Sequence, residues 1–149
     1  MPPDAQLGIE LVSHRLDELH FMREGQPEPG GAARPVDIQV QLSVSEPEGE
    51  SLSVRVGLRM KDPSVMSIDA AYIVVLRMTD QFLFEGSVEE EWKKIASRLA
   101  PVILYPFLRE TIASTLQKAG LEVPTTPILD FRRVFDPDQI RFESESASF

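Results

Sequence analysis

The stretch Leu104–Phe135, LYPFLRETIASTLQKAGLEVPTTPILDFRRVF, decides the fold of this chain. In its first half, apolar residues recur every four positions, with Phe107 beside them: Leu104, Leu108, Ile112 and Leu116. This spacing predicts an α-helix with one apolar face, which must pack against another layer of the domain. An apolar stripe of this kind is typical of a core face, and less often of a surface that binds a ligand.

The end of this helix is predicted by local signals. Lys118 lies in the last turn, where a cation suits the negative end of the helix dipole. Gly120 follows as the residue that ends the helix, and Pro124 and Pro127 prevent it from restarting. Pro106, near the start, is tolerated in a first helical turn or kinks a helix that began earlier.

Two upstream segments, 36–44 and 52–60, alternate strictly between apolar and polar residues. The period of two predicts strands with one buried and one solvated face, and the short polar turn SEPEGE between them predicts an antiparallel hairpin. The apolar positions of the first strand include Ile38, Val40 and Leu42.

The flanking segments predict two further strands. Leu7–Glu24 has strand character, but its alternation slips near His14–Asp17, which predicts a bulge. The glycine- and proline-rich segment Gly25–Arg34 predicts a flexible loop. Ile68–Phe84 is apolar on both sides, which indicates a strand buried on both faces or one at a subunit interface.

A second helix is predicted to begin at Ser87, where Ser-Val-Glu-Glu has the form of a capping box. We expect Pro101 to interrupt the chain between this helix and the long one. The order of four strands followed by two helices predicts an α+β domain with a four-stranded antiparallel sheet. We expect one domain over residues 1–142 and a disordered acidic tail over 143–149.

Composition excludes several classes of function. The chain has 149 residues, a net charge of −9 and no cysteine. The negative charge disfavours nucleic acid and anionic membrane surfaces as partners. The absence of cysteine excludes disulfides and thiol chemistry. No apolar run is long enough for a signal peptide or a membrane span, so we expect a cytoplasmic protein without direct membrane insertion.

The sequence contains no recognisable catalytic motif, neither a phosphate-binding loop nor a nucleophile elbow. The two histidines, His14 and His20, have an even spacing that could place them on one strand face, with Glu10, Asp17 or Glu18 as a third metal ligand, although the predicted bulge lies between them. We expect no catalytic residues, no metal and no cofactor. One alternative stays open, a small-ligand or hydrolytic α+β domain in which His14 or His20 is the working residue.

The run ILYPFLRETI at 103–112, followed by Gly120, Pro127 and Phe131, resembles the C-terminal signature of the SecB family of protein-export chaperones. The resemblance is specific over about thirty residues and extends in outline over 7–135 through the order of strands and helices. It implies a homotetramer, a dimer of dimers, that binds unfolded or precursor polypeptides in apolar grooves without ATP and passes them to the SecA motor.

The resemblance also implies roles for particular residues. Client binding is expected on both the strand and the helix: Ile38, Val40, Leu42, Leu104, Phe107, Leu108, Ile112 and Leu116. SecA docking is expected at Asp17 and Glu18. The oligomer interface is expected at a third set: Tyr72, Val74, Leu76, Arg109 and Glu110.

Two further hypotheses remain open, one within this resemblance and one outside it. SecB-like chaperones also serve toxin–antitoxin pairs by binding one unstable antitoxin, and this chain could be dedicated to such a client. Alternatively, the apolar strand could serve only for assembly, in a structural oligomer that ignores unfolded chains.

Overall fold

The computed structural model describes residues 8–25, 36–62, 65–80, 82, 84–124 and 129–143. These residues form strands, helices and two short helical turns, in the following order. They are β1 (Ile9–Arg23), β2 (Asp37–Ser45), β3 (Ser51–Asp62), β4 (Met66–Met78), α2 (Val88–Lys94), a π-helical turn (Ile95–Leu99), α3 (Ala100–Lys118), α4 (Phe131–Val134), a 3-10 turn (Pro137–Gln139) and β5 (Phe142–Glu143). The predicted loop at 25–34 lies outside the described residues, apart from Gly25.

The sheet has five strands in the order β1-β4-β3-β2-β5. The four long strands are antiparallel, as predicted, but β5 pairs in parallel with β2 and makes the sheet mixed. The prediction of a four-stranded antiparallel sheet was therefore wrong in strand count. The C-terminal segment returns to the edge of β2, where the Glu46 N–H donates to the Glu143 carbonyl at 3.0 Å. Glu143, predicted as the start of a disordered tail, lies in β5, whereas residues 144–149 lie outside the described residues.

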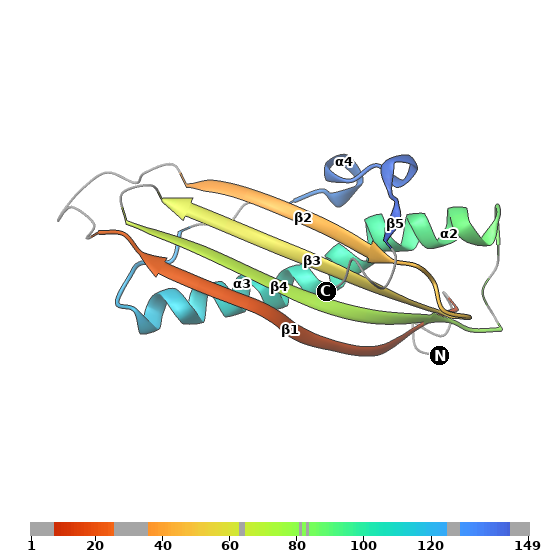
Figure 1. Ribbon diagram of the computed structural model, residues 1–149, viewed down its shortest axis with the longest axis horizontal. Coiled ribbons are helices and arrows are strands. Elements are labelled where there is room, and N and C mark those ends of the chain that lie inside the picture. Colours follow the sequence, from red (N-terminus) through yellow and green to blue (C-terminus); the bar gives the residue numbers. More distant parts are fainter. Residues whose placement is uncertain are drawn as a thin grey trace.

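The helices cover one face of this sheet, and α3 crosses behind it at an angle (Figure 1). The predicted apolar stripe of α3 is confirmed as a core face, because its four residues are at most 1% exposed: Leu104, Leu108, Ile112 and Leu116. Opposite them lie the alternate residues of β3, which are equally buried: Leu52, Val54, Val56, Leu58 and Met60. This contact between one helix face and the centre of the sheet forms the hydrophobic core.

β4 is buried on both faces, one of the two readings that its sequence allowed. Val74 and Leu76 point into the core and are fully buried. On the outer face, Ala71 and Ile73 are only 3% and 2% exposed in a single chain. The register places Ile73 between Arg15 of β1 and Arg55 of β3, so long polar side chains flank the apolar centre of the outer face.

The bulge predicted in the first strand is confirmed. The pairing of β1 with β4 shifts between Leu16 and Glu18, and a second shift lies between Leu11 and Ser13. Each shift inserts an extra residue, so the alternation of side chains restarts on the opposite face.

The helix boundaries follow the predicted signals, with one exception. Ser87 caps α2, since its hydroxyl accepts the Glu90 N–H at 3.1 Å and the Glu90 carboxylate accepts the Ser87 N–H. The expected interruption at Pro101 was wrong, because a π-helical turn joins α2 directly to α3. Pro101 then falls in the first turn of α3, where a proline is tolerated.

Gly120 ends α3 as predicted, with a positive φ of 75°. The Leu121 N–H donates to the Leu116 carbonyl at 2.9 Å, and the Gly120 N–H donates to the Gln117 carbonyl at 3.0 Å. These two bonds form a Schellman motif, which satisfies the last carbonyls of the helix.

Replacement of the buried Leu108 by alanine should lower the free energy of unfolding by about 2–5 kcal/mol, because it leaves a cavity between helix and sheet. The matched control is Val102→Ala on the exposed side of the same helix, which should change it by less than about 0.5 kcal/mol. Urea unfolding followed by circular dichroism measures both values. Equal losses in the two variants would contradict this packing.

Candidate functional site

The helix layer is narrower than the sheet that it covers. α3 packs on β3 and β4, the two central long strands, and leaves the inner faces of β1 and β2 less covered. Apolar side chains therefore line two strips, one on each side of the helix. These strips are the candidate binding surfaces of the molecule.

The first strip, here called the β1 flank, consists of Leu11, Leu16 and Leu19 with His14 and Phe107. The three leucines are each 43% exposed, although the register directs them to the same face as the core. The ring of His14 stacks on the ring of Phe107, with 4.4 Å between centroids. Within the described part of the chain, the outer edge of β1 has no neighbouring strand. The flank is thus a long apolar edge open to solvent.

The second strip, here called the β2 flank, consists of Ile38, Val40 and Leu42. All three side chains pack against the core and stay half-buried. Among the described residues, the outer edge of β2 pairs only with β5, at Val44 and Ser45. The main chain from Asp37 to Ser43 therefore offers strand hydrogen-bonding groups beside a row of apolar side chains.

The structure divides the predicted client-binding residues into three groups. Ile38, Val40 and Leu42 lie together on the β2 flank. Phe107 is 38% exposed but lies across the helix, on the β1 flank. The remaining four have at most 1% of their surface exposed, which leaves nothing for a client to contact: Leu104, Leu108, Ile112 and Leu116.

The predicted interface residues are also separated. Val74 and Leu76 are fully buried within one chain and have no surface to offer a partner. The Tyr72 hydroxyl is hydrogen-bonded to the Thr111 hydroxyl of α3 at 2.7 Å. Arg109 lies over the ring of Tyr105, 5.6 Å from its centroid, and Glu110 is exposed. The sequence analysis did not assign a binding role to Leu11, Leu16 and Leu19, which carry the exposed apolar surface on the inner face of β1.

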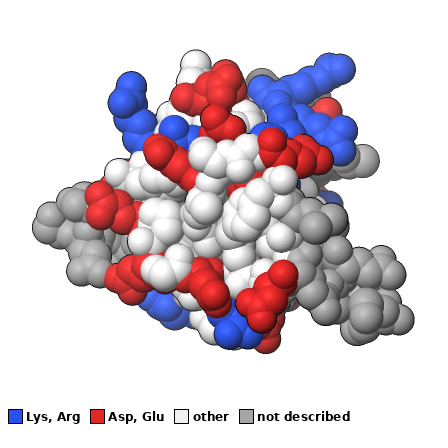
Figure 2. Space-filling model, turned by 90° about the vertical axis from the view of Figure 1, so that its right-hand side faces the viewer, with Lys and Arg blue, Asp and Glu red and all other residues white. Residues whose placement is uncertain are grey.

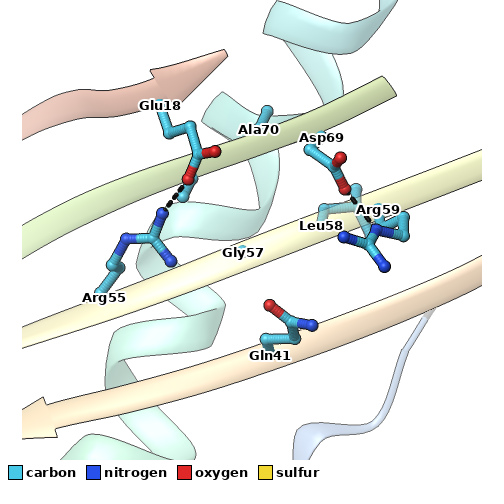
Figure 3. A pocket seen from close by; sticks show the side chains of 9 residues that line it. Glu18, Gln41, Arg55, Gly57, Leu58, Arg59, Asp69 and Ala70 are labelled. Carbon is cyan, nitrogen blue, oxygen red and sulfur yellow. Dashed lines mark hydrogen bonds and ion pairs between the residues drawn. The ribbon is translucent and has the colours of Figure 1, made fainter. Parts of the chain in front are cut away.

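Asp17 and Glu18, the residues expected to dock SecA, lie on the outer face of the sheet, opposite the helices. Both are paired with Arg55, whose Nε donates to Asp17 at 3.0 Å and whose Nη2 donates to Glu18 at 2.5 Å. Figure 3 shows Glu18 and Arg55 beside a hollow of about 70 Å³ over Gly57, with Gln41 at its far side. The two carboxylates are therefore not free negative charges.

Two other arginines of the outer face are paired with carboxylates in the same way. Arg59 donates to Asp69 at 2.6 Å, and this hydrogen bond raises the pKa of the Arg59 guanidinium. Arg77 is paired with Glu10, and that hydrogen bond likewise raises the pKa of Arg77. Seen from the end of the sheet, acidic side chains ring an uncharged centre, with Lys and Arg side chains at the upper and lower edges (Figure 2). The outer face carries alternating charges rather than one acidic field.

The two histidines do not form a site together. His14 pairs with Val74 on the inner face, whereas His20 pairs with Asp69 on the outer face. The bulge between Leu16 and Glu18 shifts the alternation, so the even spacing no longer places them on one side. Among the described residues, no group of three His, Asp or Glu could hold a metal ion. The even spacing allowed a shared face, but the bulge between the two histidines places them on opposite faces.

One groove was not anticipated from the sequence. It lies between the start of the long helix and the segment leading into α4, and has a volume of about 430 Å³. Of the residues that the structure describes, six line it: Arg98, Val102, Leu129, Asp130, Phe131 and Arg132. Phe131, part of the C-terminal signature, packs edge-on against Tyr105 with 5.4 Å between ring centroids and closes the floor.

Comparison with known proteins agrees with this geometry. A family model described as preprotein translocase subunit SecB matches residues 17–141. The chain belongs to the SecB family. The match covers most of the sheet and all of the helices, including the signature around Pro106 and Phe131.

Curated relatives support the same assignment, and a solved structure shares the fold. Protein-export protein SecB of Anaplasma phagocytophilum is 33% identical over 101 residues, 64% of each chain. SecB of Anaplasma marginale is 31% identical over 98 residues, 63% of this chain and 56% of the relative. The matches thus span less than two thirds of these relatives. The SecB-like chaperone Rv1957 of Mycobacterium tuberculosis, solved with a ChAD peptide from the HigA1 antitoxin, shares the fold with a TM-score of 0.67 at 18% identity, over 81% of this chain and 90% of that one.

Removal of the outer-face pairing in Arg55→Gln should lower the free energy of unfolding by about 1 kcal/mol, because Asp17 and Glu18 lose their shared cation in a partly covered position. A double-mutant cycle with Asp17→Asn, read by urea unfolding, measures the coupling. Arg59→Gln is the control, since its side chain is 51% exposed and should cost less. A coupling energy of zero would refute the pairing.

Proposed function

We propose that this protein is an ATP-independent holdase of the SecB type, which acts in the cytoplasm without enzymatic activity. It binds unfolded polypeptides, including precursors for export, along the β2 flank. The observation that supports this most strongly is the half-buried row of Ile38, Val40 and Leu42 beside an open strand edge. The family assignment gives this surface its expected client, and no helix in the described part of the chain is both long and apolar enough to cross a membrane.

The β2 flank suits clients of varied sequence for two physical reasons. An extended chain that pairs with the main chain of Asp37–Ser43 gains hydrogen bonds that do not depend on its sequence. Its alternate side chains then face Ile38, Val40 and Leu42 and gain free energy by leaving water. β5 supports this mode of binding, because it is an extended segment that already pairs with the same edge.

The β1 flank is proposed to bind a second copy of the chain. Three leucines that are 43% exposed lie beside the outer edge of this 15-residue strand, which has no neighbouring strand among the described residues, and such an edge would favour aggregation in an isolated monomer. Antiparallel pairing of β1 with its own copy about a two-fold axis is self-complementary and covers this surface. Two such dimers would form the tetramer expected of the family, so the interface is assigned to β1 rather than to the buried Val74 and Leu76.

A second candidate function is service to one dedicated client, such as an antitoxin, instead of delivery to SecA. The observation that favours it is the engagement of Asp17 and Glu18 by Arg55, which leaves little free negative charge on the outer face for a basic partner. The comparison protein of similar fold was solved with an antitoxin peptide. Pull-down with purified SecA distinguishes the two functions, because only the export function requires that contact.

The holdase proposal is tested by light scattering from a chemically unfolded protein diluted into buffer without nucleotide. Near-stoichiometric amounts of the chain should suppress aggregation, and addition of ATP should change nothing. A folded preparation that leaves aggregation unaltered would refute general holdase activity. Binding of a single antitoxin by that same preparation would then support the dedicated function.

The double variant Ile38→Ser/Leu42→Ser should weaken client binding about tenfold or more, because it removes two apolar contacts from the β2 flank. The matched control is Leu16→Ser/Leu19→Ser on the β1 flank, which should shift the oligomer toward monomer and affect client affinity less. Fluorescence anisotropy of a labelled unfolded client and analytical ultracentrifugation give the two readouts. If the β1 variant lost client affinity and the β2 variant lost oligomer stability, the roles assigned to the two flanks would be wrong.

A further inference from the structure

The outer face of β1 carries a pair of carboxylates that share a single cation. Asp17 and Glu18 lie next to each other at the bulge after Leu16, and both contact Arg55 of β3. In the described part of the chain no second cation contacts either of them, so this cluster keeps one negative charge. The Glu18 side chain is 56% exposed, and a cation from another molecule can therefore reach it.

Arg15 is a cation without a partner on the same face of the same strand. It aligns with Ile73 of β4, and its side chain is exposed. Among the residues that the structure describes, its guanidinium makes no ion pair and no hydrogen bond. By contrast, three arginines of β3 and β4 on this face each contact a carboxylate of the same chain: Arg55, Arg59 and Arg77. The open edge of β1 therefore carries an unused cation close to a carboxylate pair that lacks one.

These charges have the order that a strand needs to pair with its own copy. In antiparallel pairing about a two-fold axis, residues on one side of the axis lie opposite those on the other side. Counted in steps of the register with β4, Arg15 and Glu18 are each one step from Leu16, on opposite sides. An axis at Leu16 therefore places Arg15 of each copy opposite Glu18 of the other, within reach of an ion pair. Asp17 lies there too, because at a bulge two residues oppose one on the facing strand.

The neighbouring registers lack this complementarity. An axis at Arg15 or at Glu18 sets identical charges against each other, which is unfavourable. Axes at the next residues of the inner face, His14 or Leu19, place Arg15 opposite a residue without charge. Leu16 is also the midpoint of β1, so an axis there allows the strand to pair over its full length.

One more distant register also sets opposite charges against each other. An axis at Ser13 places Arg15 opposite Glu10. Glu10, however, already has a cation of its own, because it is paired one to one with Arg77. This axis also lies far from the midpoint of β1, so that about half of the strand would stay without a partner. The register centred on Leu16 is therefore favoured by both charge and length.

We propose that Arg15 sets the register in which two copies of this chain associate, by closing on the Asp17–Glu18 pair of the second copy. The two-fold axis makes this contact twice. The inference rests on the proposed function, because it specifies the pairing of the β1 flank with a second copy. On the inner face, the same register sets Leu16 against its own copy and continues the apolar row across the axis. On the outer face, Arg55, the carboxylate pair and Arg15 of the other copy form a row of alternating charges across the joined sheets.

Single cysteines measure the register directly, because the chain has none of its own. Leu16→Cys should form a covalent dimer on mild oxidation, since facing residues lie within the Cα separation that a disulfide spans. His14→Cys and Leu19→Cys should each cross-link far less, because each lies roughly 14 Å along the strand from its own copy. These two variants, when co-expressed, should instead cross-link to each other. If either of them alone cross-linked more than Leu16→Cys on a non-reducing gel, the inference would be overturned.

A charge reversal tests the role of Arg15 itself. Arg15→Glu faces two carboxylates and should weaken the dimer about tenfold or more, as measured by sedimentation velocity over a range of concentrations. Arg15→Glu/Glu18→Arg reverses both sides of the contact and should regain most of that affinity, because each copy again offers a cation to a carboxylate. Arg141→Glu is the matched control, since it makes the same change of charge at an exposed arginine outside β1 and should leave the affinity unchanged.

The outcomes separate this inference from the proposed function. An Arg15→Glu variant with the affinity of the unaltered protein, or a double variant that stays as weak as the single one, would overturn the role of Arg15 and leave the β1 interface standing. A protein that remains monomeric and forms no cross-link at any of the three positions would overturn the β1 interface as well. Suppression of aggregation by that monomer would still support the holdase function.

Discussion

The contact between one face of α3 and the centre of the sheet is the interaction on which the rest of this structure depends. Leu104, Leu108, Ile112 and Leu116 are almost completely buried and exclude water from the facing sides of β3 and β4. A single helix is narrower than four strands of a sheet. The helix therefore seals the central strands and leaves both outer strands with apolar residues that it cannot cover. In this account, binding capacity is a geometric consequence of covering a wide sheet with one helix.

The two uncovered flanks differ in ways that suit different partners. β1 is long and carries exposed leucines on its inner face. Antiparallel pairing with a copy of itself would satisfy the hydrogen-bonding groups along its outer edge. β2 is shorter, its apolar residues are half-buried, and its edge is already engaged at one end by β5. The edge of β2 already binds an extended segment of the same chain at one end. It can bind other extended segments along the rest of its length. The charges of the outer face, by contrast, are largely satisfied by neighbouring strands, which makes that face a less suitable site for a basic partner.

Local patterns predicted the elements of this fold well, because each depends on neighbours in the sequence. The period of two in β2 and β3, the capping box at Ser87 and the glycine at 120 all specify their structures within a few residues. The sequence could not predict β5, since its pairing depends on where a non-local segment returns. It also could not predict how far Phe107 would be exposed, because this residue lies about 100° around the helix from Leu108 and its burial depends on the width of the opposing sheet. His14 and His20 lie on opposite faces because a single residue is inserted between them in β1, and the slipped alternation of the sequence had indicated this bulge.

Amide hydrogen exchange with and without a bound unfolded client, followed by mass spectrometry, tests the central claim most directly. The account predicts new protection along β2 from Asp37 to Ser43, where the client pairs with the open edge, and unchanged protection in β3, β4 and the buried face of α3. Protection that appears on β1 while β2 stays unchanged would contradict the assignment of the two flanks. Increased exchange throughout β3 and β4 would contradict the central claim itself, because it would mean that clients bind by opening the core rather than along the strands that α3 leaves uncovered.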